Sequence, residues 1–221
     1  MITLYALKQS RAYRIAWLLE LLDLDYRAEI FERDTATKLA PDALRDIHPL
    51  GKSPVVDDNG TVLAESGAIV EYLIARYDAA GRLKPAADSP QWRDYLFWLH
   101  YAEGSLMPLL VMSLVFRKID ERKMPFFAKP VAHQITDGVR KSFLNPQLKL
   151  HLEFVESRLA GKSWLLGQEP GGADVMMSFP LQAALSRTEL ELPAIREYVT
   201  RIETDAAFRR AQQRLGRLDL L

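Results

Sequence analysis

A serine stands where the first helix of the chain is expected to begin. Ser10 follows a short apolar segment at residues 2–6 and precedes apolar residues at helical spacing from Ile15 to Leu22. A hydroxyl at the amino end of a helix lies beside unpaired N–H groups and the positive end of the macrodipole, which favour an anion. If that anion is a thiolate, the hydroxyl can donate a hydrogen bond to sulfur and lower the pKa of the thiol. The same serine also fits a simple helix cap.

A second candidate is the loop 51–54, which directly precedes an apolar strand pattern. A proline in a tight turn such as this can take the cis form, which would expose the backbone groups of Ser53 to an extended peptide ligand. Lys52 would then supply a cation for a carboxylate. The alternative is an ordinary loop with a solvated lysine.

The third candidate is Glu65-Ser66, between an expected hairpin and a helix. Ser66 can cap the helix and offer its N–H and hydroxyl to a carboxylate, while Glu65 can bind an ammonium group. The alternative is a capping serine beside a surface glutamate. Together the three candidates would bind a thiol, a peptide backbone and an amino-acid head group.

The composition excludes other chemistries. The chain has 221 residues and no cysteine, so disulfides, thiolate metal sites and a cysteine nucleophile are absent. The four histidines lack metal-ligand spacing, and we expect no metal. Because 29 basic residues balance 29 acidic ones, a nucleic-acid partner is not expected. The longest apolar stretch, 106–116, is shorter than the ~18 residues of a membrane span, and the start lacks a signal-peptide pattern. We therefore expect a cytoplasmic protein.

Two kinds of pattern divide the chain. Strand signals at 2–6, 26–31, 54–57 and 61–64 alternate with helix signals after Ser10, at 41–47 and after Ser66. Asn59-Gly60 marks a hairpin turn. This order predicts an α/β domain of the thioredoxin type over residues 1–81. After a linker at 82–88, helical patterns at 90–116, 125–159, 174–187, 193–204 and 205–214 predict an all-α domain over 89–221.

Five segments together carry a family resemblance: 10–22, 48–54, 65–69, 101–108 and 173–174. They resemble cytosolic glutathione S-transferases of the serine type, in a microbial branch of that family. The resemblance implies a thioredoxin-like domain that holds glutathione, a helical domain that holds a hydrophobic electrophile, and a homodimer. Such a protein would take glutathione as co-substrate and act in detoxification.

The resemblance also implies roles for individual residues. The glutathione-binding residues would be Lys52, Ser53, Pro54 (cis), Glu65, Ser66 and, at the glycyl end, Lys38. Ser10 would activate the thiol. Tyr5 is the alternative, because other branches place a catalytic tyrosine in the first strand, and activation by backbone groups or the helix dipole is a third possibility.

Residues for the second substrate are expected in the helical domain. The electrophile pocket would be lined by Tyr101, Ser105, Met107, Leu109, Met112 and Phe116, which offer adaptable apolar surface. Glu103 would lie at the dimer cleft, near the glutathione amine of the partner subunit. Gly171 stands where the family's helix-capping motif has Ser or Thr. A glycine cap costs only about a few tenths of a kcal/mol, so we expect that helix to form.

These observations predict an enzyme that adds glutathione to an electrophilic carbon or reduces a peroxide. The same fold also fits a non-catalytic binding or carrier protein, because fold does not fix function. A glutathione-dependent isomerase or dehalogenase is a further alternative.

Overall fold

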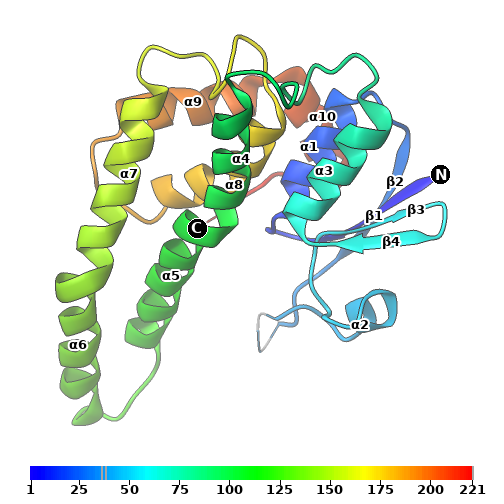
Figure 1. Cartoon of the computed structure of the whole chain (residues 1–221). Helices are drawn as coiled ribbons and strands as arrows, with labels where there is room; N and C mark the ends of the chain where they lie inside the picture. Colours follow the sequence, from blue (N-terminus) through cyan, green and yellow to red (C-terminus); the bar gives the residue numbers. More distant parts are fainter. Residues whose placement is uncertain (36, 38, 221) are drawn as a thin grey trace.

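Four strands form one sheet in the order β2-β1-β3-β4 (Figure 1). The computed structural model describes residues 1–35, 37 and 39–220. The strands are β1 (Ile2–Leu7), β2 (Tyr26–Phe31), β3 (Val55–Asp58) and β4 (Thr61–Ala64). β1 is parallel to β2 and antiparallel to β3, and β3 and β4 form the predicted hairpin. Asn59 and Gly60 both have positive φ at its turn.

Three helices accompany the sheet: α1 (Ala12–Leu21), α2 (Ala43–Ile47) and α3 (Ser66–Tyr77). In β1 the side chains of Ile2, Leu4 and Ala6 are buried, and they alternate with the partly exposed Thr3 and Tyr5. Nine of the ten residues of α1 are buried, because this helix packs on the sheet, on α3 and on the helical domain. These elements confirm the predicted thioredoxin-like domain.

The rest of the chain is helical. The first long helix joins α4 (Trp92–Tyr101), the π turn η1 (Ala102–Leu106) and α5 (Met107–Glu121). The second joins α6 (Ala128–Val139), the π turn η2 (Arg140–Leu144) and α7 (Asn145–Leu159). Three more helices follow: α8 (Gly172–Leu185), α9 (Pro193–Thr204) and α10 (Ala206–Leu215). The predicted all-α part is thus confirmed.

Both long helices contain a proline directly after their π turn. Pro108 follows η1 and Pro146 follows η2, each in the first turn of the next helical segment. A proline inside a helix lacks the N–H donor and its ring crowds the carbonyl four residues earlier. The wider π turn removes that crowding and changes the helical register.

The first long helix is more apolar than its longest apolar run suggested. Trp92–Glu121 has 30 residues, and an 18-residue window of it has a mean hydropathy of 1.3, enough by length and composition to cross a bilayer. The uninterrupted apolar run at 106–116 thus understates the apolar character of the whole helix, which by itself is only weak evidence for a membrane span. Tyr95, Trp98 and Leu110 of this helix are fully or almost fully buried in the core, however, and α4 packs on α8. Burial inside the folded protein accounts for part of the composition, since 39% of the window is buried.

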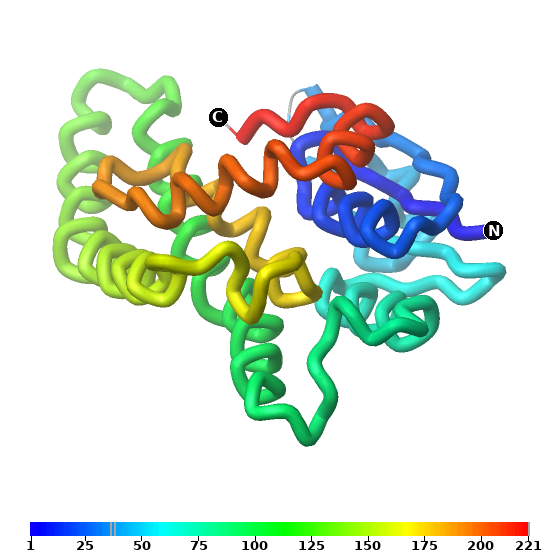
Figure 2. The backbone as a smooth tube through the Cα atoms, turned by 90° about the horizontal axis from the view of Figure 1, so that it is seen from above, coloured from blue at the N-terminus to red at the C-terminus, as the bar shows by residue number. Residues whose placement is uncertain are grey.

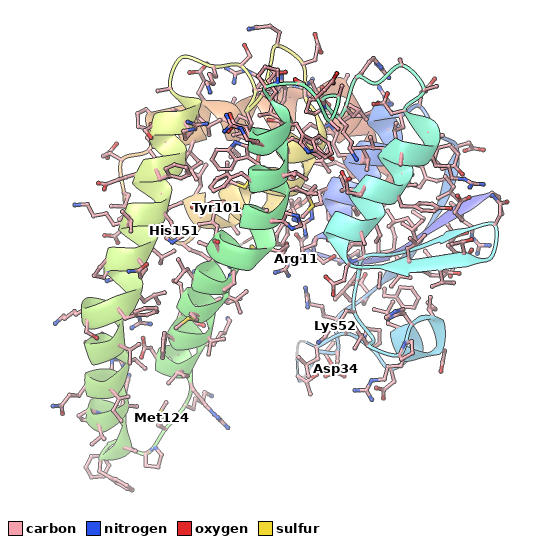
Figure 3. All side chains as sticks on the ribbon, in the orientation of Figure 1. Arg11, Asp34, Lys52, Tyr101, Met124 and His151 are labelled. Atoms are coloured by element: carbon pink, nitrogen blue, oxygen red, sulfur yellow. The ribbon has the colours of Figure 1, made fainter. Side chains whose placement is uncertain are left out.

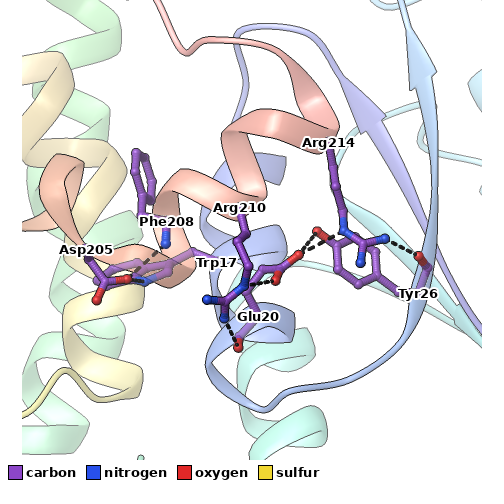
Figure 4. Close-up of polar contacts among 7 residues, drawn as sticks. All are labelled: Trp17, Glu20, Tyr26, Asp205, Phe208, Arg210 and Arg214. Atoms are coloured by element: carbon purple, nitrogen blue, oxygen red, sulfur yellow. Dashed lines mark hydrogen bonds and ion pairs between the residues drawn. The ribbon is translucent and has the colours of Figure 1, made fainter.

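The last helix returns to the first domain. Figure 2 shows α9 and α10 crossing from the helical part onto α1. Polar contacts line this seam (Figure 4). Trp17 Nε1 donates to Asp205 Oδ1 at 2.8 Å, and the Glu20 carboxylate pairs with Arg210 at 2.7 Å and Arg214 at 2.9 Å. Most core residues of both domains form one continuous hydrophobic cluster.

Gly171 precedes helix α8 where the resemblance leads one to expect a serine or threonine cap, and the structure explains how the helix starts without that hydroxyl. The N–H of Gly172 donates to the carbonyl of Leu83 in the linker at 2.8 Å, so the start of α8 is capped without a hydroxyl. Asp174 accepts from the N–H of Gly171 at 2.9 Å. A Cβ on Gly171 would lie 3.0 Å from the Leu83 oxygen. The expectation that this helix forms with a glycine cap is confirmed.

Candidate functional site

A cavity of about 260 Å³ gathers most of the predicted glutathione-binding residues. It is lined by Arg11, Leu50, Lys52, Ser53, Pro54, Ala64, Glu65, Ser66 and Glu103. Three segments of the first domain thus meet the π turn η1 of the helical domain. Figure 3 shows Arg11 and Lys52 on the side of the first domain that faces α4 and α5. Lys38 lies outside the described residues.

The loop before β3 is bonded to the end of β1. The Ser53–Pro54 peptide is cis. Ser53 Oγ accepts from the N–H of Leu7 at 2.9 Å and donates to the carbonyl of Tyr5 at 3.1 Å. Because its hydroxyl is used within the protein, Ser53 has only its backbone groups left for a ligand. Lys52 is exposed at the cavity, and no ion pair of its ammonium is found in the described part of the chain.

The junction between β4 and α3 has an unusual backbone. Glu65 has φ 70°, a region that non-glycine residues seldom adopt and that is concentrated at functional sites. Ser66 is the first residue of α3, so the prediction that it caps this helix was wrong by one position. No side chain caps α3, and the start of the helix therefore keeps N–H groups for an anion.

Ser10 lies at the start of α1, with 6% of its surface exposed. Its Oγ accepts from the N–H of Ala12, the first residue of the helix, at 3.2 Å. Within residues 1–35, 37 and 39–220 no acceptor for its hydroxyl proton is found. The oxygen therefore has a capping contact while the proton can be donated to another group. Ser10 does not line the 260 Å³ cavity itself, whereas the adjacent Arg11 does.

Tyr5 occupies a different environment. Its strand neighbours Leu4 and Ala6 are buried, so by strand alternation Tyr5 lies on the opposite face of the sheet. Its ring is 6.5 Å from that of Phe31. Burial, followed by the charges of Glu29 and Asp57, raises the pKa of Tyr5. These surroundings disfavour an anion beside the phenol.

Two arginines of α1 hold the glutamate of η1. Arg11 Nε lies 2.8 Å from Glu103 Oε1, and the fully buried Arg14 reaches the same oxygen with Nη2 at 2.5 Å. Arg14 Nη1 also donates to the carbonyl of Met176 at 2.9 Å. Burial raises the pKa of Glu103, but the charges of Arg14 and Arg11 and their hydrogen bonds outweigh it, and the net shift is downward. Burial lowers the pKa of Arg14 to about 10, so both partners stay charged at neutral pH.

The roles of Arg11 and Arg14 were missed in the sequence. A signal was present: Arg14 interrupts an apolar helical run, and Glu103 does the same in another helix. Charges in buried positions need partners, so two such residues of opposite sign are candidates for a pair. The placement of Glu103 at a dimer cleft stays a prediction.

The six residues expected around the electrophile are not brought into one cavity. Met107 and Leu109 are buried in the core, and Met112 and Phe116 pack against it. Tyr101 and Ser105 line an open cavity of about 440 Å³ on another side of α4. The Tyr101 hydroxyl lies 2.7 Å from His151 Nδ1, and the two rings stack. Their assignment to an electrophile pocket stays a prediction.

A further cavity and the question of metal binding complete the description of the site. A larger cavity of about 750 Å³ lies between α5, η2, α7 and the segment after α8, and it contains none of the predicted glutathione residues. The described residues contain no group of three or more His, Cys, Asp or Glu side chains that could hold a metal ion.

Comparison with known proteins agrees with the geometry of the site. The sequence model described as glutathione S-transferase, N-terminal domain, matches residues 1–75. Glutathione S-transferase 3 of Schizosaccharomyces pombe is 35% identical over 83% of this chain and 74% of its own length. Glutathione S-transferase 1 of Saccharomyces cerevisiae is 32% identical over 96% and 94%.

A solved structure extends the similarity to the whole fold. The crystal structure of a glutathione S-transferase from Actinobacillus pleuropneumoniae superposes with a TM-score of 0.81 and 38% sequence identity. The match covers 100% of this chain and 95% of the other. With two curated relatives above 30% identity over most of their length, the chain belongs to the glutathione S-transferase family.

Proposed function

We propose that this protein binds glutathione in the 260 Å³ cavity and joins it, through its sulfur, to a hydrophobic electrophile. The observation that carries the proposal is the charge pattern of the cavity. Glutathione has a carboxylate at its glycyl end, and a carboxylate and an ammonium group at its γ-glutamyl end. Lys52 suits the first carboxylate, the uncapped start of α3 at Ser66 suits the second, and Glu65 suits the ammonium group.

The proposed reaction uses Ser10 as a hydrogen-bond donor. The serine oxygen accepts a hydrogen bond from the N–H of Ala12, and its hydroxyl donates a hydrogen bond to the glutathione sulfur. This lowers the pKa of the thiol, whose proton leaves to solvent. The thiolate then forms a carbon–sulfur bond, and either a leaving group departs or the electrophile takes up a proton. Contacts at both ends of glutathione hold the sulfur in place, which is a proximity contribution.

The substitution Ser10→Ala tests this role. Conjugation of a chloronitroaromatic substrate should fall about tenfold to a hundredfold in kcat/KM, the value of one charge-assisted hydrogen bond. The pH profile should also move to higher pH, because the bound thiol loses the donor that lowers its pKa. Tyr5→Phe is the matched control and should change neither quantity. Equal turnover by Ser10→Ala and the wild type would leave the backbone and the helix dipole as activators.

The proposal also includes a homodimer, a cytoplasmic location and the division into residues 1–81, 82–88 and 89–221. Light scattering of the purified protein tests the dimer.

Capture on immobilised glutathione, followed by assays with electrophiles, peroxides and disulfides, separates a transferase from a carrier. Capture without activity on any of these substrates would favour the carrier.

A further inference from the structure

Two phenylalanines are exposed at the end of the α5–α6 hairpin. Phe126 and Phe127, in the connection between these helices, are 89% and 69% exposed, and their rings contact each other at 5.7 Å. Val131 and Ile135 follow Phe127 at intervals of four residues along α6, and both are also exposed. Isolated apolar residues are common on protein surfaces, but a contiguous apolar patch marks a site of interaction.

The surroundings of these rings are basic. Residues 122–136 contain three cations, Arg122, Lys123 and Lys129, and no aspartate or glutamate. All three are exposed, and within the described ranges none of them forms an ion pair. The acidic residues that precede the segment are already paired: Glu121 with Lys118 at 3.0 Å, and Asp120 with Arg140 at 2.5 Å. The tip therefore combines aromatic side chains with an uncompensated positive charge.

The shape of this region favours one kind of partner. Figures 1 and 3 show the hairpin projecting beyond the rest of the molecule, with Met124 at its far end. A stable protein interface buries about 800 Å² on each partner, which a narrow projecting tip does not offer. A lipid surface needs no complementary shape, and it takes up aromatic rings at the headgroup boundary while its anionic headgroups attract nearby cations.

We propose that the tip formed by residues 122–129, with Phe126 and Phe127 as its aromatic anchors, attaches the protein to anionic lipid membranes. The rings enter the headgroup region, and Arg122, Lys123 and Lys129 remain at the phosphate level. None of the residues of the tip lines the 260 Å³ cavity, so attachment through this end would not use the cavity. The inference does not depend on the proposed transferase activity.

Cosedimentation of the full-length protein with vesicles tests the proposal. The wild type should bind vesicles that contain phosphatidylglycerol more tightly than vesicles of phosphatidylcholine alone, and less tightly as salt is added. The double variant Phe126→Ser/Phe127→Ser should bind at least about tenfold more weakly, because it loses two insertable rings. Lys123→Gln/Lys129→Gln should lose the preference for anionic lipid.

Matched controls lie elsewhere on the surface. Val62→Ser removes an exposed apolar side chain from β4, and Lys162→Gln removes an exposed cation beyond α7; neither should alter vesicle binding. Thermal unfolding establishes that each variant is folded. Equal binding by the wild type and the phenylalanine variant would overturn the proposal, as would failure of the wild type to bind anionic vesicles. It would also fail if the phenylalanine variant changed the oligomeric state seen by light scattering, because the tip would then be a protein interface.

Discussion

At the residue scale, Glu103 links the two domains beside the candidate site. Its carboxylate comes from the helical domain, and the two guanidinium groups that hold it come from α1. Arg14 is fully buried and has no other carboxylate partner among the described residues. Removing one partner of a buried ion pair leaves an uncompensated charge in a low-dielectric environment, which costs more than the pair itself contributes.

We therefore expect Glu103→Gln to lower the free energy of unfolding by about 2–3 kcal/mol at neutral pH. Since the folded protein lowers the pKa of Glu103, this stabilisation is present above the ordinary carboxyl pKa and is lost as pH falls through the lowered value. The difference between variant and wild type should thus shrink in acid. Urea unfolding at neutral and acidic pH measures both effects.

The surface substitution Glu121→Gln is the comparison for this prediction. Glu121 is exposed and pairs with the exposed Lys118 at 3.0 Å and, loosely, with Arg117 at 3.9 Å, so its loss should cost less than about 1 kcal/mol. A cost for Glu103→Gln no larger than this would show that the buried pair does not stabilise the junction between the domains.

At the element scale, the start of α8 depends on the carbonyl of Leu83. Gly171→Ser would restore the residue type usual in the family, and hydroxyl caps normally stabilise a helix. Here we expect the opposite, a loss of about 1 kcal/mol, because the new Cβ would press on the Leu83 oxygen that caps Gly172. The melting temperature should fall by about 2–4 °C. Gly167→Ser, where a Cβ meets no neighbour within 4 Å, should have little effect, and a rise in melting temperature for Gly171→Ser would contradict this explanation.

This element also shows what the sequence could and could not predict. The strands and the Asn59-Gly60 hairpin followed from alternation and turn chemistry, which are local. The contact of Gly172 with Leu83 joins residues far apart in the sequence and required the fold. For the same reason the apolar residues Met107 and Leu109 could not be assigned to core or pocket, since both environments select the same side chains.

At the scale of the whole molecule, helix α1 contributes to the hydrophobic cores of both domains. It packs on the sheet on one side and on α8 and α10 on the other, and its residues lie in the one cluster that spans both domains. We expect calorimetry to show a single unfolding transition for the full chain. A fragment of residues 1–81 should show no cooperative transition, because its α1 would expose Trp17 and its neighbours. Two separate transitions in the full chain would contradict this expectation.

The shared helix also limits how this protein can diversify. A recombination within residues 82–88 would exchange the helical domain and keep the first domain. In this chain such an exchange would set foreign side chains against α1, Arg14 and Trp17 among them. Productive recombinants must therefore keep Asp205 for Trp17 and Arg210 for Glu20, whereas Arg14 needs only the main-chain carbonyl at position 176. The residues that must be inherited together therefore extend beyond the first domain.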